Sequence, residues 1–526
     1  MIRAFPKAAD MFLGLDSSTQ SISALIIDPA TGTVIADESV NFGDDLPQYG
    51  APSGFIPEGK GGEVHSDPLM WLDALDLLFS KLAEKADLSS VAVIAGSGQQ
   101  HGSVYLSPGF EETVGNLDAS QGLSAQLAAT LSRPTSPIWM DTSTAAECSE
   151  ITASLGGSAE VCSRSGSVAI ERFTGPQIRK YSKTDPAGYA STQRIHLVSS
   201  FIASVLAGKS LPIDYGDGAG MNLMNLKDLA WDEGLLEATA PDLAAKLLPP
   251  SSCLVPQGTM STYFTEKYGF SPDCKVCPFT GDNPASLVGM GATSPGQVVI
   301  SLGTSDTFFA AMPEAKTDPN GYGHVFGNPA GGFMSLICFR NGSLAREALR
   351  DELGVDWTAF EKDALTTTSA SAGKNLTLPF YGAEITPRHD FGKPVTSFSE
   401  EASPALRIRS LLEGQFLNMR LNSAWMGVTT DRIRLTGGAA KNDGIAQIVA
   451  DVFQAPVERL EVANSAALGA ALVAAAAGGH NLVSLQEIFC KSAPGPLIEP
   501  DTSLAGKYST ALAEFGKLLQ QTIHAQ

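Results

Sequence analysis

A strand–turn–strand pattern that occurs twice limits the possible fold of this chain more than any other feature. The first copy, Met11 to Asp28, reads MFLGLDSSTQSISALIID, and the second, Val298 to Ala310, reads VVISLGTSDTFFA. In each copy an apolar run of strand length meets a cluster of Gly, Ser and Thr, and a second apolar run follows. A tight turn of this composition directs backbone N–H groups and hydroxyls at one point, an arrangement that suits phosphate.

The two copies differ at one chemically important position. When they are aligned, Thr19 matches Thr304 and Asp16 matches Ser301, so only the first copy carries a carboxylate. This difference predicts that the first turn manages a metal ion and the second a terminal phosphate. Two ordinary Ser/Thr-rich hairpins are the alternative, and for either copy taken alone that alternative is favoured.

Length and charge restrict the class of protein and its partners. A chain of 526 residues is long for one core, so two or more domains are expected. The formal net charge of −21 argues against nucleic acid or anionic membrane as a standing partner, because phosphate backbones require a basic face. ATP remains compatible with this charge, since one nucleotide needs only local dipoles and Mg²⁺.

The cysteines and the N-terminal residues bear on the cellular compartment. Seven scattered cysteines are typical of reduced cytosolic thiols, and the lone pair Cys274 and Cys277 is interpreted as core or strand-edge cysteines rather than a zinc site. Neither the first ten residues nor the Ala-rich segment 466–477 has the length of a targeting or membrane-spanning segment. We therefore expect a cytoplasmic protein.

The elements that follow each copy also recur. After the first copy, a strand is predicted at 33–40, a helix from 67 onward and a buried strand at 91–95; after the second, a strand at 333–339 and a helix at 343–353. This order predicts two similar α/β domains with mixed sheets.

Further signals lie between and after the copies. The Gly/Pro-rich segment 289–296 is the natural hinge. Later, the strand 432–436 runs into Gly437 and Gly438, and Asn442 is expected to cap a helix that ends at Phe453. Paired glycines after a strand permit close approach of a flat ligand such as adenosine, with a plain β-turn as the alternative.

Several separated motifs match a known family when they are taken in order. The chain resembles the FGGY carbohydrate kinases of the actin/hexokinase-like superfamily, and among them the xylulokinases of the eukaryotic type. The resemblance covers nearly the whole chain and depends on Leu15–Gln20, Gly98–Gly102, Glu171–Gly175, Ile213–Asn222, Gly281–Asn283, Ser301–Ser305 and Thr436–Gly438.

The resemblance implies a fold and a reaction. The fold is α/β, with two actin/hexokinase-like (ribonuclease H-like) domains and a ligand cleft between them. Residues 1–291 would form the sugar-binding domain with the first phosphate turn, and residues 292–526 the domain with the second turn and the adenosine site. The reaction is ATP-dependent phosphorylation of D-xylulose to D-xylulose 5-phosphate in pentose catabolism, with Mg²⁺ as cofactor.

Two carboxylates receive roles from the resemblance. Asp282 matches the catalytic aspartate, the base that takes the proton of the sugar hydroxyl; an N-cap is the alternative, because Asp before Asn-Pro often starts a helix. Asp16 would hold Mg²⁺, mainly through water, and a turn-capping aspartate is the alternative. Many family members have Gly at the position of Ser18, so here a Cβ crowds the first turn, and the hydroxyl of Ser18 is a possible donor to phosphate.

The sugar contacts implied by the resemblance are His101, Arg172, Asp282 and Asn283. A satisfied loop histidine is the alternative for His101, and a surface salt bridge is the alternative for Arg172. Asp214 and Asp217 are interpreted as residues that shape a Gly-rich loop, with substrate contact as the less favoured role.

The ATP contacts implied by the resemblance come from both halves of the chain. Trp357 resembles a nucleotide contact of the eukaryotic-type enzymes, and an anchor for helix packing is the equally favoured alternative. The full set consists of Ser18, Thr19, Gly303, Thr304, Trp357, Gly437, Gly438 and Asn442.

Other functions and assembly states stay open at this point. A kinase for ribulose, glycerol or another open-chain sugar or polyol is one alternative, and a non-catalytic ATP switch of the same superfamily is another. A base beside a sugar pocket disfavours the switch. The expected partners are D-xylulose and ATP, without nucleic acid or membrane, in a monomer or homodimer.

Overall fold

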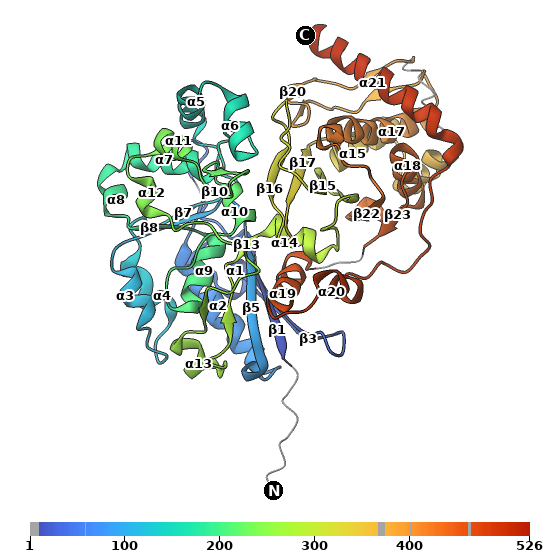
Figure 1. The fold of residues 1–526 in the computed structure, drawn as a ribbon. Coiled ribbons are helices and arrows are strands. Elements are labelled where there is room, and N and C mark those ends of the chain that lie inside the picture. The colour runs from blue at the N-terminus through green and yellow to red at the C-terminus, as the bar shows by residue number, and fades with distance from the viewer. Residues whose placement is uncertain (1–9, 58, 367–373, 400, 461–463, 526) are drawn as a thin grey trace. The chain divides into compact units, whose positions relative to one another are not determined.

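The structure is a computed structural model that describes residues 10–57, 59–366, 374–399, 401–460 and 464–525. The chain divides into two units, each with its own central sheet (Figure 1). The first unit contains residues 1–291, 326–332 and 463–490, and the second contains residues 292–325, 333–462 and 491–526. The chain therefore returns to the first unit twice after leaving it.

A seven-stranded sheet organises the first unit. Its strands are β1 (Met11–Ser17), β2 (Ser21–Asp28), β3 (Thr33–Asn41), β5 (Val91–Gly98), β11 (Gly258–Thr259), β12 (Lys275–Val276) and β13 (Thr280–Gly281). The order is β11-β12-β5-β1-β2-β3, and β13 also pairs with β5. β1 pairs antiparallel with β2 and parallel with β5, so the sheet is mixed.

A six-stranded sheet organises the second unit, with the order β16-β17-β15-β14-β22-β23. Its strands are β14 (Gln297–Leu302), β15 (Asp306–Met312), β16 (His324–Gly327), β17 (Phe333–Phe339), β22 (Arg432–Thr436) and β23 (Val457–Arg459). β14 pairs antiparallel with β15 and parallel with β22.

The same four-strand arrangement occurs in both sheets. The order β5-β1-β2-β3 of the first sheet corresponds to β22-β14-β15-β17 of the second, with the same parallel and antiparallel pairings. In the register with the parallel neighbour, Asp16 lies opposite Ser97 and Ser301 lies opposite Thr436. The alignment of Asp16 with Ser301, and the prediction of two similar mixed-sheet α/β domains, are confirmed.

Helices bury the faces of both sheets. In the first unit the longer ones are α2 (Pro68–Ala83), α5 (Ala145–Ser154), α6 (Ser158–Ser165), α7 (Thr174–Thr184), α9 (Val198–Ala207), α14 (Asp282–Gly289), α19 (Ser465–Ala477) and α20 (Leu482–Phe489). In the second they are α15 (Ser343–Leu353), α16 (Trp357–Thr366), α17 (Pro404–Ser423), α18 (Asp443–Phe453) and α21 (Ala505–Ala525).

Helix α2 shows why these elements form where the sequence predicted them. The Asp67 carboxylate caps the helix by accepting from the N–H of Leu69, and Pro68 occupies the first turn. Trp71 and Phe79 on its inner face are fully buried. Burial of each such side chain stabilises the fold by about 1.5–3 kcal/mol.

Helix α19 comes from the C-terminal third of the sequence but packs in the first unit, against β1 and α14 (Figure 1). Glycines allow this close approach. A Cβ on Gly14 would lie 2.2 Å from the Ala467 carbonyl oxygen, and a Cβ on Gly469 would lie 1.8 Å from the Ala285 carbonyl oxygen. Backbone thus contacts backbone along both sides of α19.

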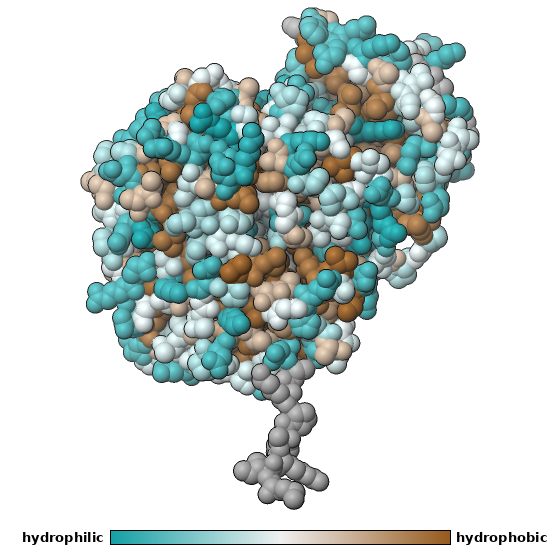
Figure 2. Space-filling view, viewed as in Figure 1, coloured by the Kyte–Doolittle hydropathy of each residue, from teal (hydrophilic) through white to brown (hydrophobic). Residues whose placement is uncertain are grey.

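The surface shown in Figure 2 and the buried cysteines are those expected of a protein with a polar exterior and an apolar core. On the face shown in Figure 2, hydrophilic residues are interspersed with apolar ones. Within the described ranges, no helix combines the length and apolar character needed to cross a bilayer. Cys274 and Cys277 are buried, and burial raises the pKa of both thiols to about 12, as expected for core cysteines.

Candidate active site

Asp16 and Asp282 lie at the carboxyl ends of parallel strands in the first sheet. β1, β5 and β13 run in one direction, and Asp16, Ser97 and Thr280 share one row of the register. Asp282 follows β13 directly and is the first residue of α14. The carboxyl edge of parallel strands is where α/β proteins bind ligands, so this row is a candidate site.

The Asp16 carboxylate is buried and held by two hydroxyls. It accepts a hydrogen bond from Ser18 and another from Ser97, whose Oγ lies 2.7 Å away. Burial raises the pKa of Asp16, and the two hydroxyls oppose that rise. Ser18 therefore contacts the carboxylate directly, which a glycine at this position would not do.

Asp282 has the environment of a group that exchanges protons near neutral pH. Burial, with a further contribution from the charge of Asp16, raises the pKa of Asp282 from 3.8 to about 7, although the residue keeps a partial opening to solvent. Gly281, not Asp282, is the N-cap of α14, and Asp282 Oδ1 accepts from the N–H of Asn283 at 2.8 Å. A carboxyl group with a pKa near the working pH suits general-base chemistry.

Two glutamines beside Asp282 hold buried polar atoms without hydrogen-bond partners among the described residues. Neither side-chain polar atom of Gln99 has a partner, and the same holds for Nε2 of Gln100. Gln100 Oε1 accepts from the Asn283 amide at 2.8 Å, which orients that amide. Buried polar groups in native proteins are nearly always satisfied, so these atoms point to a bound ligand or water. Sequence reasoning named the motif but gave Gln99 and Gln100 no role.

His101 is fixed as a neutral imidazole. Burial, with the nearby charge of Arg172, lowers the pKa of His101 to about 3, and its Nδ1 lies 2.8 Å from the carbonyl oxygen of Gly220. Because a carbonyl only accepts, Nδ1 carries the proton and Nε2 is left as an acceptor. The residue also has a φ of +73°, a left-handed conformation that is uncommon outside glycine and frequent at functional sites.

Arg172 comes just before Phe173, the N-cap of α7, and its guanidinium stacks on the ring of Phe173, which also packs against the His101 ring. Its guanidinium is partly exposed, and it acts electrostatically on His101. The structure thus brings Arg172 and His101 together around Phe173.

The Gly-rich loop around Asp214 and Asp217 contains a short helix, α10 (Tyr215–Ala219). Asp214 is its N-cap and accepts from the N–H of Gly216, which confirms a loop-shaping role. Asp217 is fully buried and accepts from Ser199 Oγ; burial, with the charges of Asp282 and Asp214, raises its pKa well above the usual value. Its Oδ1 has no partner among the described residues.

The segment 18–20 between β1 and β2 is the first of the two turns predicted to bind phosphate. Thr19 Oγ1 accepts from the indole N–H of Trp139 at 2.8 Å, and Trp139 is 43% exposed. Trp139 has no predicted role, because nothing in the sequence indicates that its loop reaches this turn. The threonine hydroxyl retains its own proton for donation to another group.

The second turn predicted to bind phosphate, 303–305, is held in place by a buried arginine. Arg346 of α15 forms a bidentate pair with Asp306, with both N–O distances 3.0 Å, and its guanidinium also approaches the carbonyl oxygen of Gly303 at 3.4 Å. Thr304 itself is exposed. Sequence reasoning missed Arg346, although an arginine on the buried face of a predicted helix signals a buried charge partner.

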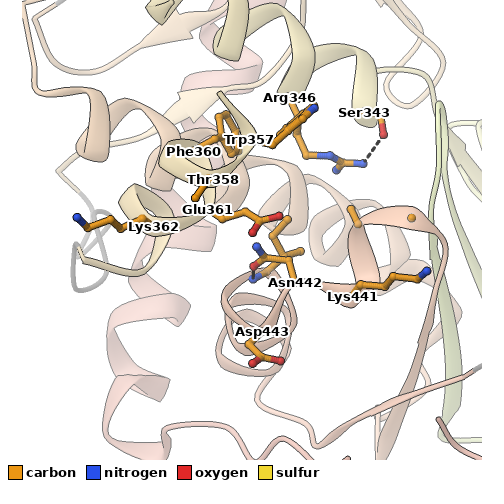
Figure 3. A pocket seen from close by; sticks show the side chains of 13 residues that line it. Ser343, Arg346, Trp357, Thr358, Phe360, Glu361, Lys362, Lys441, Asn442 and Asp443 are labelled. Atoms are coloured by element: carbon orange, nitrogen blue, oxygen red, sulfur yellow. Dashed lines mark hydrogen bonds between the residues drawn. The ribbon is translucent and has the colours of Figure 1, made fainter. Parts of the chain in front are cut away.

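A cavity of about 680 Å³ in the second unit brings together three predicted ATP contacts, Trp357, Gly438 and Asn442 (Figure 3). Trp357, 41% exposed, begins α16 and lines the cavity, while the Arg350 guanidinium stacks on its ring at 4.6 Å. Gly438 and Asn442 line the same cavity. Gly437 adjoins it with φ +93°, and a Cβ there would lie 2.3 Å from the Leu302 carbonyl oxygen. A Cβ on Gly438 would meet nothing within 4 Å, so this glycine faces open space.

The residues around Asp16 fit Mg²⁺ but do not form a complete metal cage. In the part of the chain that the structure describes, no group of three or more His, Cys, Asp or Glu could hold a metal ion. Mg²⁺ usually keeps several waters and binds one or two carboxylates together with substrate phosphates. A buried carboxylate with a raised pKa would be stabilised in its charged form by such a cation.

Comparisons with known proteins identify the family. Residues 134–289 match the N-terminal domain of the FGGY family of carbohydrate kinases, and residues 298–478 match its C-terminal domain. Xylulose kinase of Rattus norvegicus is 41% identical over 97% of this chain and 97% of that protein, and xylulose kinase 2 of Arabidopsis thaliana is 40% identical over 88% and 87%.

A solved structure supports the fold independently. The xylulose kinase of Rhodospirillum rubrum superposes with a TM-score of 0.79 at 20% identity, covering 97% of this chain and 98% of that one. The matched domains span both units, and the relatives span nearly the full length. This chain is a sugar-phosphorylating enzyme and belongs to the FGGY family of carbohydrate kinases.

Proposed function

We propose that this enzyme transfers the γ-phosphoryl group of ATP to D-xylulose and forms D-xylulose 5-phosphate. The observation that carries the proposal is the placement of Asp282, with a pKa raised to about 7, beside Asp16 at one edge of the first sheet. The full-length similarity to proteins named xylulose kinase supports D-xylulose as the acceptor.

Asp282 acts as the general base in this proposal. The sugar hydroxyl oxygen forms the new bond to the γ-phosphorus while the bond from that phosphorus to the β–γ bridging oxygen breaks and ADP leaves. The hydroxyl proton moves to the Asp282 carboxylate. Positioning and charge neutralisation supply most of the acceleration of phosphoryl transfer, and general-base catalysis typically adds a factor of about 10²–10⁴.

His101, Arg172 and Asn283 hold the sugar. The neutral His101 accepts a hydroxyl hydrogen bond at Nε2, since Nδ1 is engaged with Gly220. Asn283 is oriented by Gln100, and the unpartnered atoms of Gln99 and Gln100 are suited to further polar contact. This arrangement of hydrogen-bond acceptors and donors fits a polyhydroxylated substrate.

The remaining assignments concern ATP and Mg²⁺. Mg²⁺, held near Asp16, would neutralise charge on the phosphates. Thr19, Gly303 and Thr304 bind phosphate groups, whereas the Ser18 hydroxyl donates to Asp16. Trp357, Gly438 and Asn442 in the cavity of the second unit, with the adjoining Gly437, bind adenosine. We assign the sugar-binding function to residues 1–291 and the adenosine-binding function to residues 292–526, in a cytoplasmic monomer or homodimer.

A substrate panel tests the proposal against its alternatives. Purified enzyme with ATP and Mg²⁺ is assayed with D-xylulose, D-ribulose and glycerol, and the products are identified by mass and NMR. The highest kcat/KM is expected with D-xylulose, phosphorylated at O5. A higher value with ribulose or glycerol would reassign the substrate, and ATP turnover that ignores every sugar would favour an ATP switch.

A further inference from the structure

Trp139 places a large, partly exposed ring beside the turn that follows β1. The residue is 43% exposed, whereas its neighbour Ile138 is buried. Its indole N–H donates to Thr19 Oγ1 at 2.8 Å, across 120 residues of sequence. The contact therefore joins a surface side chain to a turn that is predicted to bind phosphate.

The loop that carries Trp139 is anchored before and after this residue. It follows β7 (Ser136–Pro137), which pairs with β4 (His65–Ser66). After Trp139, the fully buried carboxylate of Asp141 accepts from the N–H of Val64 at 3.1 Å. The loop thus offers a fixed site for the indole.

The backbone of the turn is also closely packed. Gly54 has a φ of +81°, and a Cβ there would lie 1.8 Å from the carbonyl oxygen of Thr19. Glycine allows this approach because it has no Cβ and adopts a positive φ readily. With the backbone held in this way, the direction of the Thr19 hydroxyl proton is what remains to be set.

The indole sets the direction of that proton. A threonine hydroxyl has one O–H donor and two acceptor lone pairs, and an indole N–H can only donate. Because the Trp139 N–H occupies one lone pair of Thr19 Oγ1, the Thr19 O–H points away from the indole. The proton is therefore available to a phosphate oxygen, and a hydrogen bond to a charged oxygen is stronger than one between neutral groups.

We propose that Trp139 is a positioning residue for phosphoryl transfer, which holds the Thr19 hydroxyl in the orientation that donates to a phosphate group of ATP. This inference rests on the proposed function, because it requires Thr19 to contact phosphate. Trp139 needs no contact of its own with ATP or with the sugar, since it acts through Thr19.

Three substitutions and one control test this role. Trp139→Phe removes the N–H and keeps an aromatic ring, and because the side chain is partly exposed, its Tm should stay close to that of the parent. Thr19→Val removes the hydroxyl, and Thr19→Ser keeps it. Trp231→Phe is the matched control, because Trp231 lies in the same unit and its indole N–H donates to the Leu248 carbonyl oxygen at 2.7 Å.

The measured quantity is kcat/KM for ATP at saturating D-xylulose. Thr19→Val, which loses a hydrogen bond to a charged group, should lower it about tenfold or more. Trp139→Phe should lower it about 2- to 10-fold, the range expected for one net hydrogen bond, while the KM for D-xylulose stays unchanged. Trp231→Phe should keep the parental values.

A double-mutant cycle distinguishes positioning from a general effect on the structure. In the Thr19→Val background, Trp139→Phe should cause no further loss, because the hydroxyl that it orients is absent. In the Thr19→Ser background, Trp139→Phe should again lower kcat/KM, because the hydroxyl is present.

Parental activity of Trp139→Phe, together with an impaired Thr19→Val, would overturn the positioning role. An equal loss from Trp139→Phe with and without the Thr19 hydroxyl would overturn it too, since Trp139 would then act independently of Thr19. Parental kcat/KM in Thr19→Val would remove the phosphate contact assigned to Thr19, and this inference with it. If the parent enzyme did not phosphorylate D-xylulose, the proposed function itself would be wrong.

Discussion

Replacement of Asp282 by Asn distinguishes two properties of this carboxylate: its role in the reaction, and the destabilisation of the folded protein that its ionisation causes. The folded protein raises the pKa of Asp282 from 3.8 to about 7, so the folded state binds this proton more tightly than the unfolded state does. The contribution of the protonated Asp282 carboxyl group to the free energy of unfolding is fully present below pH about 4. It is lost as the pH rises to about 7. Above pH 7 the ionised carboxylate destabilises the ligand-free protein.

The size of the effect follows from the two pKa values. The difference between 3.8 and about 7 corresponds to about 4 kcal/mol, as an upper limit. Because Asp282 keeps partial access to solvent, we expect about 1–3 kcal/mol. Asp282→Asn has similar volume and cannot ionise, so it should unfold at a higher temperature than the parent at pH 8 and at a nearly equal temperature at pH 4.5.

Scanning calorimetry without ligands, from pH 4.5 to pH 8.5, measures this difference in Tm. Asp273→Asn serves as the control, because it removes one negative charge from an exposed position of the same unit. In parallel, kcat of Asp282→Asn should fall by about 10² or more, with D-xylulose still bound. A Tm difference that does not change with pH would refute the buried environment of Asp282, and near-normal kcat would refute its role as base.

Three further predictions concern other parts of the site. Asp16→Ala should strongly lower kcat and weaken the dependence of activity on Mg²⁺, while the affinity for D-xylulose changes little. Identical Mg²⁺ titration curves for the variant and the parent enzyme would contradict this. Gly438→Ala should raise the KM for ATP about tenfold at unchanged Tm, whereas Gly506→Ala, at an equally open glycine of α21, should alter neither. Arg346→Leu should lower stability by about 3–5 kcal/mol, measured by denaturant unfolding, because Asp306 would keep a buried charge without its partner; a loss below 1 kcal/mol would show that the pair is unimportant.

Much of the fold could be predicted because local signals and burial agree along the chain. The caps at Asp67 and Asn442, the strand Phe333–Phe339 and the helix Ser343–Leu353 occur where the sequence indicates them. Each combines an unambiguous period with a polar residue at its boundary. The short strand β16 (His324–Gly327) was missed, since four residues between turns give no periodicity.

The site was only partly predictable, because contacts between distant segments leave no local signal. The resemblance supplied His101 and Asp282, yet nothing in the sequence indicates that Trp139 donates to Thr19 or that Arg346 anchors the second turn. These partners are 120 and 40 residues apart. Which residues form such hydrogen-bonded pairs is determined by tertiary packing alone.

The insertion of α19 into the first unit has a consequence for how the protein is made. A ribosome synthesises residues 1–291 long before residues 465–477, so β1 and α14 must wait for the helix that covers them. At 5–20 residues per second, this delay lasts about 10 to 40 s. During that time the uncovered strand β1 is an aggregation hazard, and a fragment that ends at residue 291 would keep it exposed permanently. Biosynthesis thus requires nearly the whole chain before the half with the proposed base is complete.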